Sequence, residues 1–357
     1  MAELFRYADV DIFWMIHHYH LLHMTFLKSI FLHIALILFS VIPDSSSAQQ
    51  VAYHNYSENF TETTSFGDLQ EKPYKSEFFR VRGIPKVTVH TTTGNIEVFQ
   101  NPDINGVKVD LFLERSFSLW SGRRSLDNFR IILQQQGDRI IASVEDKKSG
   151  QVPRDSDIKF HFLVQTPKNV TTNLRAFNGN IFLDDVEGDH FIQNQTGDIS
   201  ISHTKGEIRV VSTTGNIDLA NVKGNVYAKT VNGSVNIVSN SGEARVRSVS
   251  GDIHASKMRG TLVSATTSGN IYADFTDVSK GIYLETISGD IELFLPETSG
   301  FDIEGSAMSY DLRGLRESSI TESDQNQRDL NVVIREGGLP VRVSTMSGRI
   351  QVSESQK

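Results

Sequence analysis

The sequence predicts an all-β protein: a single-stranded parallel β-solenoid (β-helix) with 18-residue rungs and an irregular β cap on its N-terminal side. Three observations lead to this prediction. A glycine stands at every ninth residue from Gly179 to Gly269, every second glycine begins a Gly-(Asn/Asp)-Ile triplet or a close variant, and apolar residues alternate with polar ones in between. A short fixed period indicates one unit stacked on copies of itself, and alternation with period two is typical of strands.

Each 18-residue rung holds two short strands. When residues are numbered from the first glycine of a rung as position zero, positions two, four, eleven and thirteen are mainly apolar, and β-branched residues are common among them, as strands favour. Like strands are therefore expected to stack in parallel about 4.8 Å apart, in two rows that face each other across a thin core. Position two contains Ile181, Ile199, Ile217, Val235, Ile253 and Ile271, and position eleven contains His190, Ile208, Val226, Ala244, Leu262 and Ile282.

Gly-polar pairs mark the corners between strands, because glycine takes a positive φ without steric cost and Asn or Asp tolerates it. Ser and Thr recur at positions fifteen and seventeen, where they are expected to hydrogen-bond up and down the stack. After Gly269 the next triplet begins at Gly289, 20 residues later, so residues 276–280 are expected to bulge outward. Residues 311–331 are expected to form a long polar excursion.

The N-terminal part carries a predicted secretion signal. Lys28 supplies the positive charge, residues 31–42 are apolar, and Ser46-Ser47-Ala48 forms a small-residue cleavage site. The alternative is an uncleaved membrane anchor. We expect the following organisation: 1–23, an upstream extension with translation beginning at Met24; 24–48, signal peptide; 49–77, polar linker; 78–175, N-terminal β cap; 176–295, regular solenoid; 296–357, irregular C-terminal rungs.

The composition limits the cellular compartments and the kinds of partner that are expected for this protein. The formal net charge is -8, which argues against a nucleic-acid role driven by global electrostatics. The chain contains no cysteine, so it has no disulfide, no thiol chemistry and no residue on which a bacterial lipoprotein anchor could form. These features predict an exported protein of the periplasm, outer cell surface or medium, with no stable membrane span once the signal is removed.

Several segments resemble one bacterial family of adhesin-like β-solenoid domains of unknown function, related to the heads of autotransporter-like adhesins. The resemblance rests on Thr-Thr-Gly-Asn-Ile at 213–217, Thr-Ser-Gly-Asn-Ile at 267–271, Ile-Ser-Gly-Asp-Ile at 287–291 and the closing segment 343–350. It covers roughly residues 78–352 and implies cell-surface attachment by analogy only. The family offers no catalytic or ligand-binding residues to carry over.

Two surface features are candidate binding sites. Outward positions twelve and fourteen of neighbouring rungs should bring basic residues and one aromatic ring together, in a patch suited to an anionic glycan or a polyanionic surface polymer. The alternative is plain packing of long side chains along a sheet. The second feature is a loop with Trp120, Arg123 and Arg124, which is either a contact tip or part of the cap. The patch contains Arg209, Tyr227, Lys229, Arg245 and Arg247.

Other chemistry is not expected. The Asn/Asp corner residues resemble a calcium site only distantly, because each nine has one glycine and half of the corner residues are neutral. The histidines of the repeats occupy different positions, and Asp184-Asp185 has no carboxylate counterpart in the next rungs. We therefore name no catalytic, metal or cofactor-binding residue.

The sequence favours an exported, non-enzymatic protein that binds or scaffolds at the bacterial cell envelope. Its expected partners are an envelope or extracellular polysaccharide or a surface protein. Two alternatives stay open: a structural protein that polymerises end to end, and a polysaccharide-active β-helix enzyme.

Overall fold

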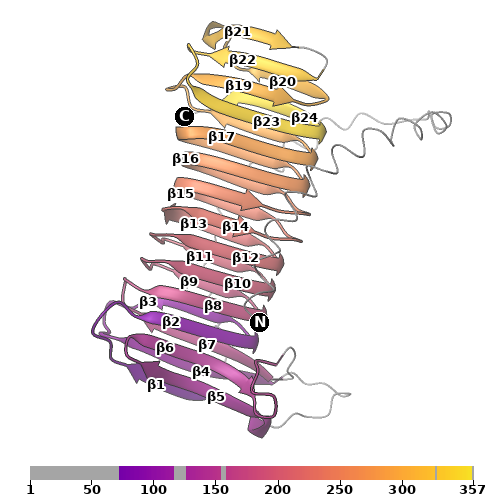
Figure 1. Ribbon diagram of the computed structural model, residues 1–357. Coiled ribbons are helices and arrows are strands. Elements are labelled where there is room, and N and C mark those ends of the chain that lie inside the picture. Colours follow the sequence, from indigo (N-terminus) through magenta and orange to yellow (C-terminus); the bar gives the residue numbers. More distant parts are fainter. Residues whose placement is uncertain (1–71, 116–125, 154–157, 326–327, 356–357) are drawn as a thin grey trace, which may run out of the picture. The chain divides into compact units, whose positions relative to one another are not determined.

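Within the part of the chain that the structure describes, the regular elements are β-strands apart from two short 3-10 turns, η2 (Leu126–Asn128) and η3 (Glu317–Ser319). The prediction of an all-β protein is confirmed for the residues that the structure describes. The strands lie across one long axis, and the chain advances along it through β8 to β17 (Figure 1). The computed structural model describes residues 72–115, 126–153, 158–325 and 328–355.

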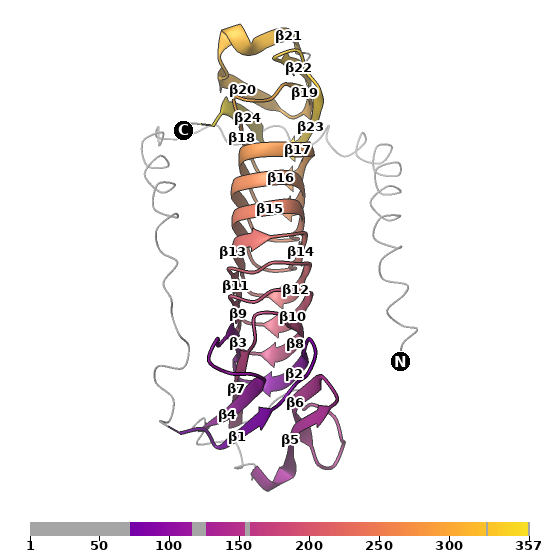
Figure 2. The ribbon, with the colours of Figure 1, turned by 90° about the vertical axis from the view of Figure 1, so that its left-hand side faces the viewer.

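Two rows of parallel strands form the centre of the fold. Row 1 contains β9, β11, β13, the first parts of β15, β16 and β17, and β18; row 2 contains β8, β10, β12, β14 and the second parts of the same long strands (Figure 2). Cα partners in neighbouring strands are one repeat apart, as in His190↔Ile208 and Ile199↔Ile217. The bounds are β8 Thr171–Asn178, β9 Ile181–Asp184, β10 His190–Thr196, β11 Ile199–Ser202, β12 Ile208–Thr214, β13 Ile217–Lys223, β14 Val226–Lys229, β15 Val235–Arg247, β16 Ile253–Ser268, β17 Ile271–Ser288 and β18 Ile291–Leu295.

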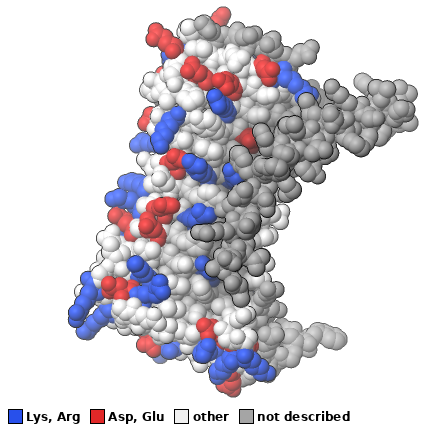
Figure 3. Space-filling model, viewed as in Figure 1, with Lys and Arg blue, Asp and Glu red and all other residues white. Residues whose placement is uncertain are grey.

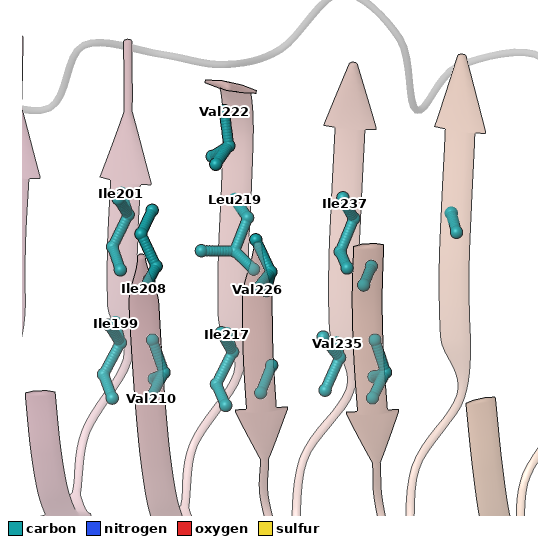
Figure 4. Packing of buried hydrophobic residues seen from close by; sticks show 14 of the residues in the cluster. Ile199, Ile201, Ile208, Val210, Ile217, Leu219, Val222, Val226, Val235 and Ile237 are labelled. Atoms are coloured by element: carbon teal, nitrogen blue, oxygen red, sulfur yellow. The ribbon is translucent and has the colours of Figure 1, made fainter. Parts of the chain in front are cut away.

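The core lies between the two rows. Val210 of row 2 lies beside Ile199 of row 1, and Ile208 and Val226 lie beside Ile201 and Leu219 (Figure 4); all six are at most 2% exposed. The alternation that the sequence shows is therefore the alternation of inward and outward side chains in a pleated strand. Position seven is a further buried column that the sequence reading did not identify; it contains Val186, Thr204, Val222, Asn240 and Met258.

The corners explain the glycine period. Gly215 has φ +133°, and an added Cβ would lie 2.2 Å from the carbonyl oxygen of Gly197, one rung earlier. Glycine is thus required both by the backbone conformation and by the close approach of stacked corners. A second kind of corner was not predicted: the residues at position six adopt the left-handed conformation without being glycine. They are Asp185, His203, Asn221, Ser239 and Lys257, with φ between 49° and 61°.

The Ser and Thr side chains at position fifteen do not form the predicted hydrogen bonds up and down the stack. The hydroxyl of Thr266 donates to the carbonyl oxygen of Gly251 at 3.1 Å, and that of Thr286 donates to Gly269 at 3.0 Å. In each case the acceptor is the glycine that begins the same rung, not a residue of a neighbouring rung. The reason is geometric: position fifteen is buried, and its short side chain reaches the inside of the corner. These bonds close their own rungs, whereas Asn194 at the same position donates both to Gly179 of its own rung and to Gly197, which begins the next.

The N-terminal end combines one rung with an inserted cap. β2 pairs in parallel with β8, and β3 with β9, so Asn95 lies beneath Asn180 although 85 residues separate them. The chain between β3 and β8 forms antiparallel pairs, β4 with β1 and β7, and β5 with β6. The bounds are β1 Lys75–Phe79, β2 Lys86–Thr93, β3 Ile96–Gln100, β4 Val107–Arg115, β5 Phe129–Gln136, β6 Arg139–Asp146 and β7 Ile158–Thr166.

The C-terminal end bears out one prediction and corrects another. The two additional residues of this rung form a bulge in β17 between Val278 and Ile282, next to where the sequence predicts it, and Ser279 and Lys280 are exposed; the strand itself is continuous, and Phe275 is fully buried. Much of the expected polar excursion 311–331 is strand, because β21 forms an antiparallel ladder with β22. Such a ladder is made of backbone hydrogen bonds, so a polar segment can join it. The bounds are β19 Phe301–Ser306, β20 Ser309–Gly314, β21 Ile320–Gln325, β22 Asp329–Ile334, β23 Leu339–Ser347 and β24 Arg349–Glu354.

Candidate functional site

The outer face of row 2 brings the predicted patch together. Arg209 of β12 is the register partner of Tyr227 in β14, which is in turn the partner of Arg245 in β15. Lys229 and Arg247 are partners in the same two strands. Parallel strands in register place equal positions side by side, so residues 18 apart in sequence become neighbours on one surface. We call these five residues the basic patch.

Cations and rings alternate along this face. The Arg209 guanidinium carbon lies 4.6 Å from the centre of the Tyr227 ring, and that of Arg175 lies 5.4 Å from the centre of the Phe191 ring. Phe191 is also the register partner of Arg209. Both distances fall in the range of cation–π attraction. The patch therefore extends to Phe191 and Arg175. The sequence reading missed Arg175 because it precedes the first glycine of the period.

Only one cation of the basic patch pairs with a carboxylate among the described residues. Arg245 Nε lies 2.6 Å from a carboxylate oxygen of Glu243, whose pKa falls mainly through this hydrogen bond. Among the described residues, Arg209, Lys229 and Arg247 have no carboxylate partner within ion-pair distance. Charged groups of both signs occur in small groups on the surface seen in Figure 3, so this positive region is local. Its three unpaired cations are available to an anionic ligand.

The Asn/Asp corner column caps the backbone of neighbouring rungs. The N–H of Asn216 donates to Asp198 Oδ1 at 2.8 Å, and the N–H of Asp198 donates to Asn180 Oδ1 at 2.9 Å. The N–H of Asn270 donates to Asp252 Oδ1 at 2.7 Å in the same way. These carboxylates stand at every second rung or further apart, which limits repulsion between them. Turn chemistry accounts for the column, and within the described ranges no three His, Asp or Glu converge on a possible metal position.

One polar cluster was not expected from the sequence. His203 Nδ1 lies 3.0 Å from Asp184 Oδ1, and Ser202 Oγ donates to the same oxygen at 2.6 Å. The other ring nitrogen of His203 lies 3.3 Å from the Asn221 amide. A nucleophilic serine would need to bond to the histidine, whereas Ser202 bonds to the aspartate. The neighbouring Asp185 pairs with Lys168. The cluster therefore joins three successive rungs at an exposed corner.

The remaining histidines of the repeats are structural in their contacts. His190 occupies the core at position eleven, 2% exposed, with Nδ1 3.0 Å from the Thr172 hydroxyl. Burial lowers its pKa to about 4. His254 stacks on Tyr272 on the outer face of row 1. The predicted contact loop with Trp120, Arg123 and Arg124 lies outside the described residues, as does the predicted signal peptide.

A stack of rungs whose outward side chains lie on two flat faces defines a β-solenoid-like protein. Comparison with protein families identifies the family: the model of the Toastrack family DUF4097 matches residues 82–353. The chain therefore belongs to this family. No helix of the described residues has the length and apolar character needed to cross a membrane.

Comparison with solved structures finds chains that match this one at low sequence identity and low TM-score. A candidate adhesin from Bacteroides fragilis has 14% sequence identity, covers 62% of this chain and 97% of its own, and has a TM-score of 0.36. A candidate adhesin from Parabacteroides distasonis has 14% identity over 61% and 98%, with a TM-score of 0.32. A candidate cell adhesion protein from Clostridium sporogenes has 11% identity over 80% and 100%, with a TM-score of 0.23. No curated protein matches the chain.

Proposed function

We propose that this protein is an exported, non-enzymatic, adhesin-like β-solenoid that binds a polyanionic polysaccharide of the cell envelope or the extracellular medium. The ligand lies along the outer face of row 2, across the rungs that carry the basic patch. The signal-like segment that ends at Ala48 supports export. The absence of a nucleophile–base pair in the Ser202 cluster favours binding over catalysis.

The alternating ladder of cations and rings carries this proposal. Arg209 and Tyr227 recur at the spacing of the rungs, so a chain molecule with repeated anionic groups meets a repeated set of cations. The rings hold the guanidinium groups in place and reduce the side-chain entropy lost on binding. Plain surface packing would explain the ring contacts, but it gives no reason for three cations without a carboxylate partner.

The test is retention on an array of anionic glycans. The triple variant R209S/R245S/R247S is expected to lose at least tenfold in affinity, and retention of the unmodified chain is expected to fall steeply with salt. The matched control is R80S/R82S/R139S, which removes the same charge from exposed arginines without an ion pair to a described residue. Equal retention of the two triple variants would overturn the proposal. Circular dichroism of both variants establishes that the fold is intact.

End-to-end polymerisation is the weaker alternative. The N-terminal rung formed by β2 and β3 is covered by β6 and β7, which pair with it in parallel and pair antiparallel with β5 and β4; the sequence of these four strands does not repeat the 18-residue pattern. A neighbouring molecule would therefore meet a cap rather than an open rung. Caps of this kind limit strand addition at the ends of solenoids.

A further inference from the structure

The outer face of row 1 is acidic and carries no Lys or Arg. Outward positions three and five on β3, β9, β11, β13, β15, β16, β17 and β18 are occupied by carboxylic, small polar, apolar and aromatic residues. Among the described residues, none of the carboxylates forms an ion pair with a Lys or Arg. We call this surface the acidic face; its carboxylates are Glu97, Asp184, Asp218, Asp274 and Glu292.

No carboxylate of the acidic face pairs with a Lys or Arg, although Asp184 contacts Ser202 and His203 and Asp274 accepts a hydrogen bond from Ser355 Oγ at 2.7 Å. Burial raises the pKa of Glu97, and the negative charge of Asp184 adds to that effect. Burial also raises the pKa of Asp218, opposed by a hydrogen bond from Asn236, and the pKa of Glu292, opposed by the charge of Arg349. Partly desolvated carboxylates without cationic partners would gain from a cation brought to this face.

Aromatic rings make the same surface favourable for guanidinium groups. The His254 and Tyr272 rings are stacked with centroids 4.3 Å apart and an interplanar angle of 10°, and the Phe294 ring lies 5.2 Å from that of Tyr272. Burial raises the pKa of Tyr272 to about 12, so its ring stays neutral. Ring faces attract arginine. Toward the middle of the acidic face several outward side chains are short and half-buried, such as Ser200 and Ser202.

The same molecule carries a surface of the required chemistry on its other side. The basic patch faces outward from row 2, its cations are mostly arginine, and they stand on three consecutive rungs, whereas the carboxylates of the acidic face are spread over a longer stretch of the stack. From this complementarity we infer that the acidic face of one copy binds the basic patch of a second copy. Two acidic faces or two basic patches would repel each other, so the contact is heterologous and repeats to build a stack of solenoids.

This inference goes beyond the proposed function and does not depend on it. A polyanion and the acidic face of a second copy would compete for the same arginines. Added polyanion is therefore expected to dissociate the stack. A variant of the acidic face should lose self-association and keep polyanion binding, whereas a variant of the basic patch should lose both. The two proposals can therefore fail separately.

Sedimentation velocity of the full chain at low and high salt tests the inference. The unmodified chain is expected to associate with increasing concentration at low salt and to dissociate as salt rises. The variant D218N/D274N/E292Q is expected to weaken association at least tenfold. The control D103N/D277N/E317Q makes the same change of charge at exposed carboxylates outside both faces and should associate like the unmodified chain.

Charge reversal separates a direct contact from a structural effect. D218K/D274K/E292K leaves both faces positive, and R209E/R245E/R247E leaves both negative, so neither variant should associate alone. An equimolar mixture should associate. Three results would overturn the inference: a monomer at all concentrations, association that both acidic-face and control variants share equally, or binding of a poly-arginine peptide without any self-association.

Discussion

At the scale of single residues, the corner glycines determine whether a rung can close. Gly215→Ala would place a methyl group 2.2 Å from the carbonyl oxygen of Gly197, at φ +133°. The strained backbone alone costs roughly 1–3 kcal/mol, and the contact with the preceding rung adds to it. We expect a clear fall in the urea midpoint. Gly137→Ala is the control: its φ is +63°, and its added Cβ would meet nothing within 4 Å. A similar loss in both variants would contradict the stacking argument.

The buried His190 should make stability depend on pH. Its pKa in the folded protein is about 4, whereas an unfolded histidine titrates near 6.5. Above pH ~6.5 both states are neutral; as pH falls from there toward 4, the unfolded chain binds a proton that the folded chain does not, so stability is lost. The expected loss is roughly 3 kcal/mol.

The double variant T172V/H190V isolates this effect. It replaces a buried hydrogen-bonded pair by two residues of the kind found elsewhere in the column, such as Val226. Urea unfolding at pH 7 and pH 4.5 should show a smaller loss on acidification in the variant than in the unmodified chain. His90 and His161 also have lowered pKa values and keep part of the dependence. An unchanged difference between the two pH values would show that His190 titrates normally.

At the scale of elements, the sequence predicts the features that recur with the same kind of residue and misses those that do not. The inward positions of β9 to β17 follow directly from alternation, because burial selects apolar residues at every second place. The left-handed residues at position six could not be found, since Asp185, His203 and Lys257 share no composition that marks a turn. The position of the bulge in β17 was predicted, but the continuity of the strand through it was not, because two extra residues fit an outward loop and a bulged strand equally well.

The basic patch was found and the acidic face was not, although both are outward surfaces of the same rungs. Arg209 and Arg245 are long, charged and spaced at the repeat, so they stand out among alternating residues. The acidic face is recognised only when residues as distant as Glu97 and Glu292 are seen on one surface without a cation between them. The position of Asn95 beneath Asn180 likewise required the structure, since the cap between them interrupts the period.

At the scale of the whole molecule, the rung of 18 residues should behave as a unit that can be removed. Deleting residues 216–233 joins Gly215 to Ser234 and sets Ile199 beside Val235, so that β12 continues into β15 through a corner of the usual kind. In a solenoid each rung contacts only its neighbours, and stability is nearly a sum of local terms. We expect a folded chain with a somewhat lower Tm.

Deleting nine residues, 224–232, keeps the glycine period and should nevertheless damage the fold. After the deletion, the left-handed and half-buried Ser239 takes the place of the buried Thr230. The buried Asn240 takes the place of the half-buried Val231. Buried and half-buried places are thus exchanged. Thermal unfolding followed by circular dichroism should give a much lower Tm, or no cooperative transition, for the nine-residue deletion. If both deletions gave the same Tm, the two halves of a rung would be interchangeable, and the unit of the stack would be nine residues rather than eighteen.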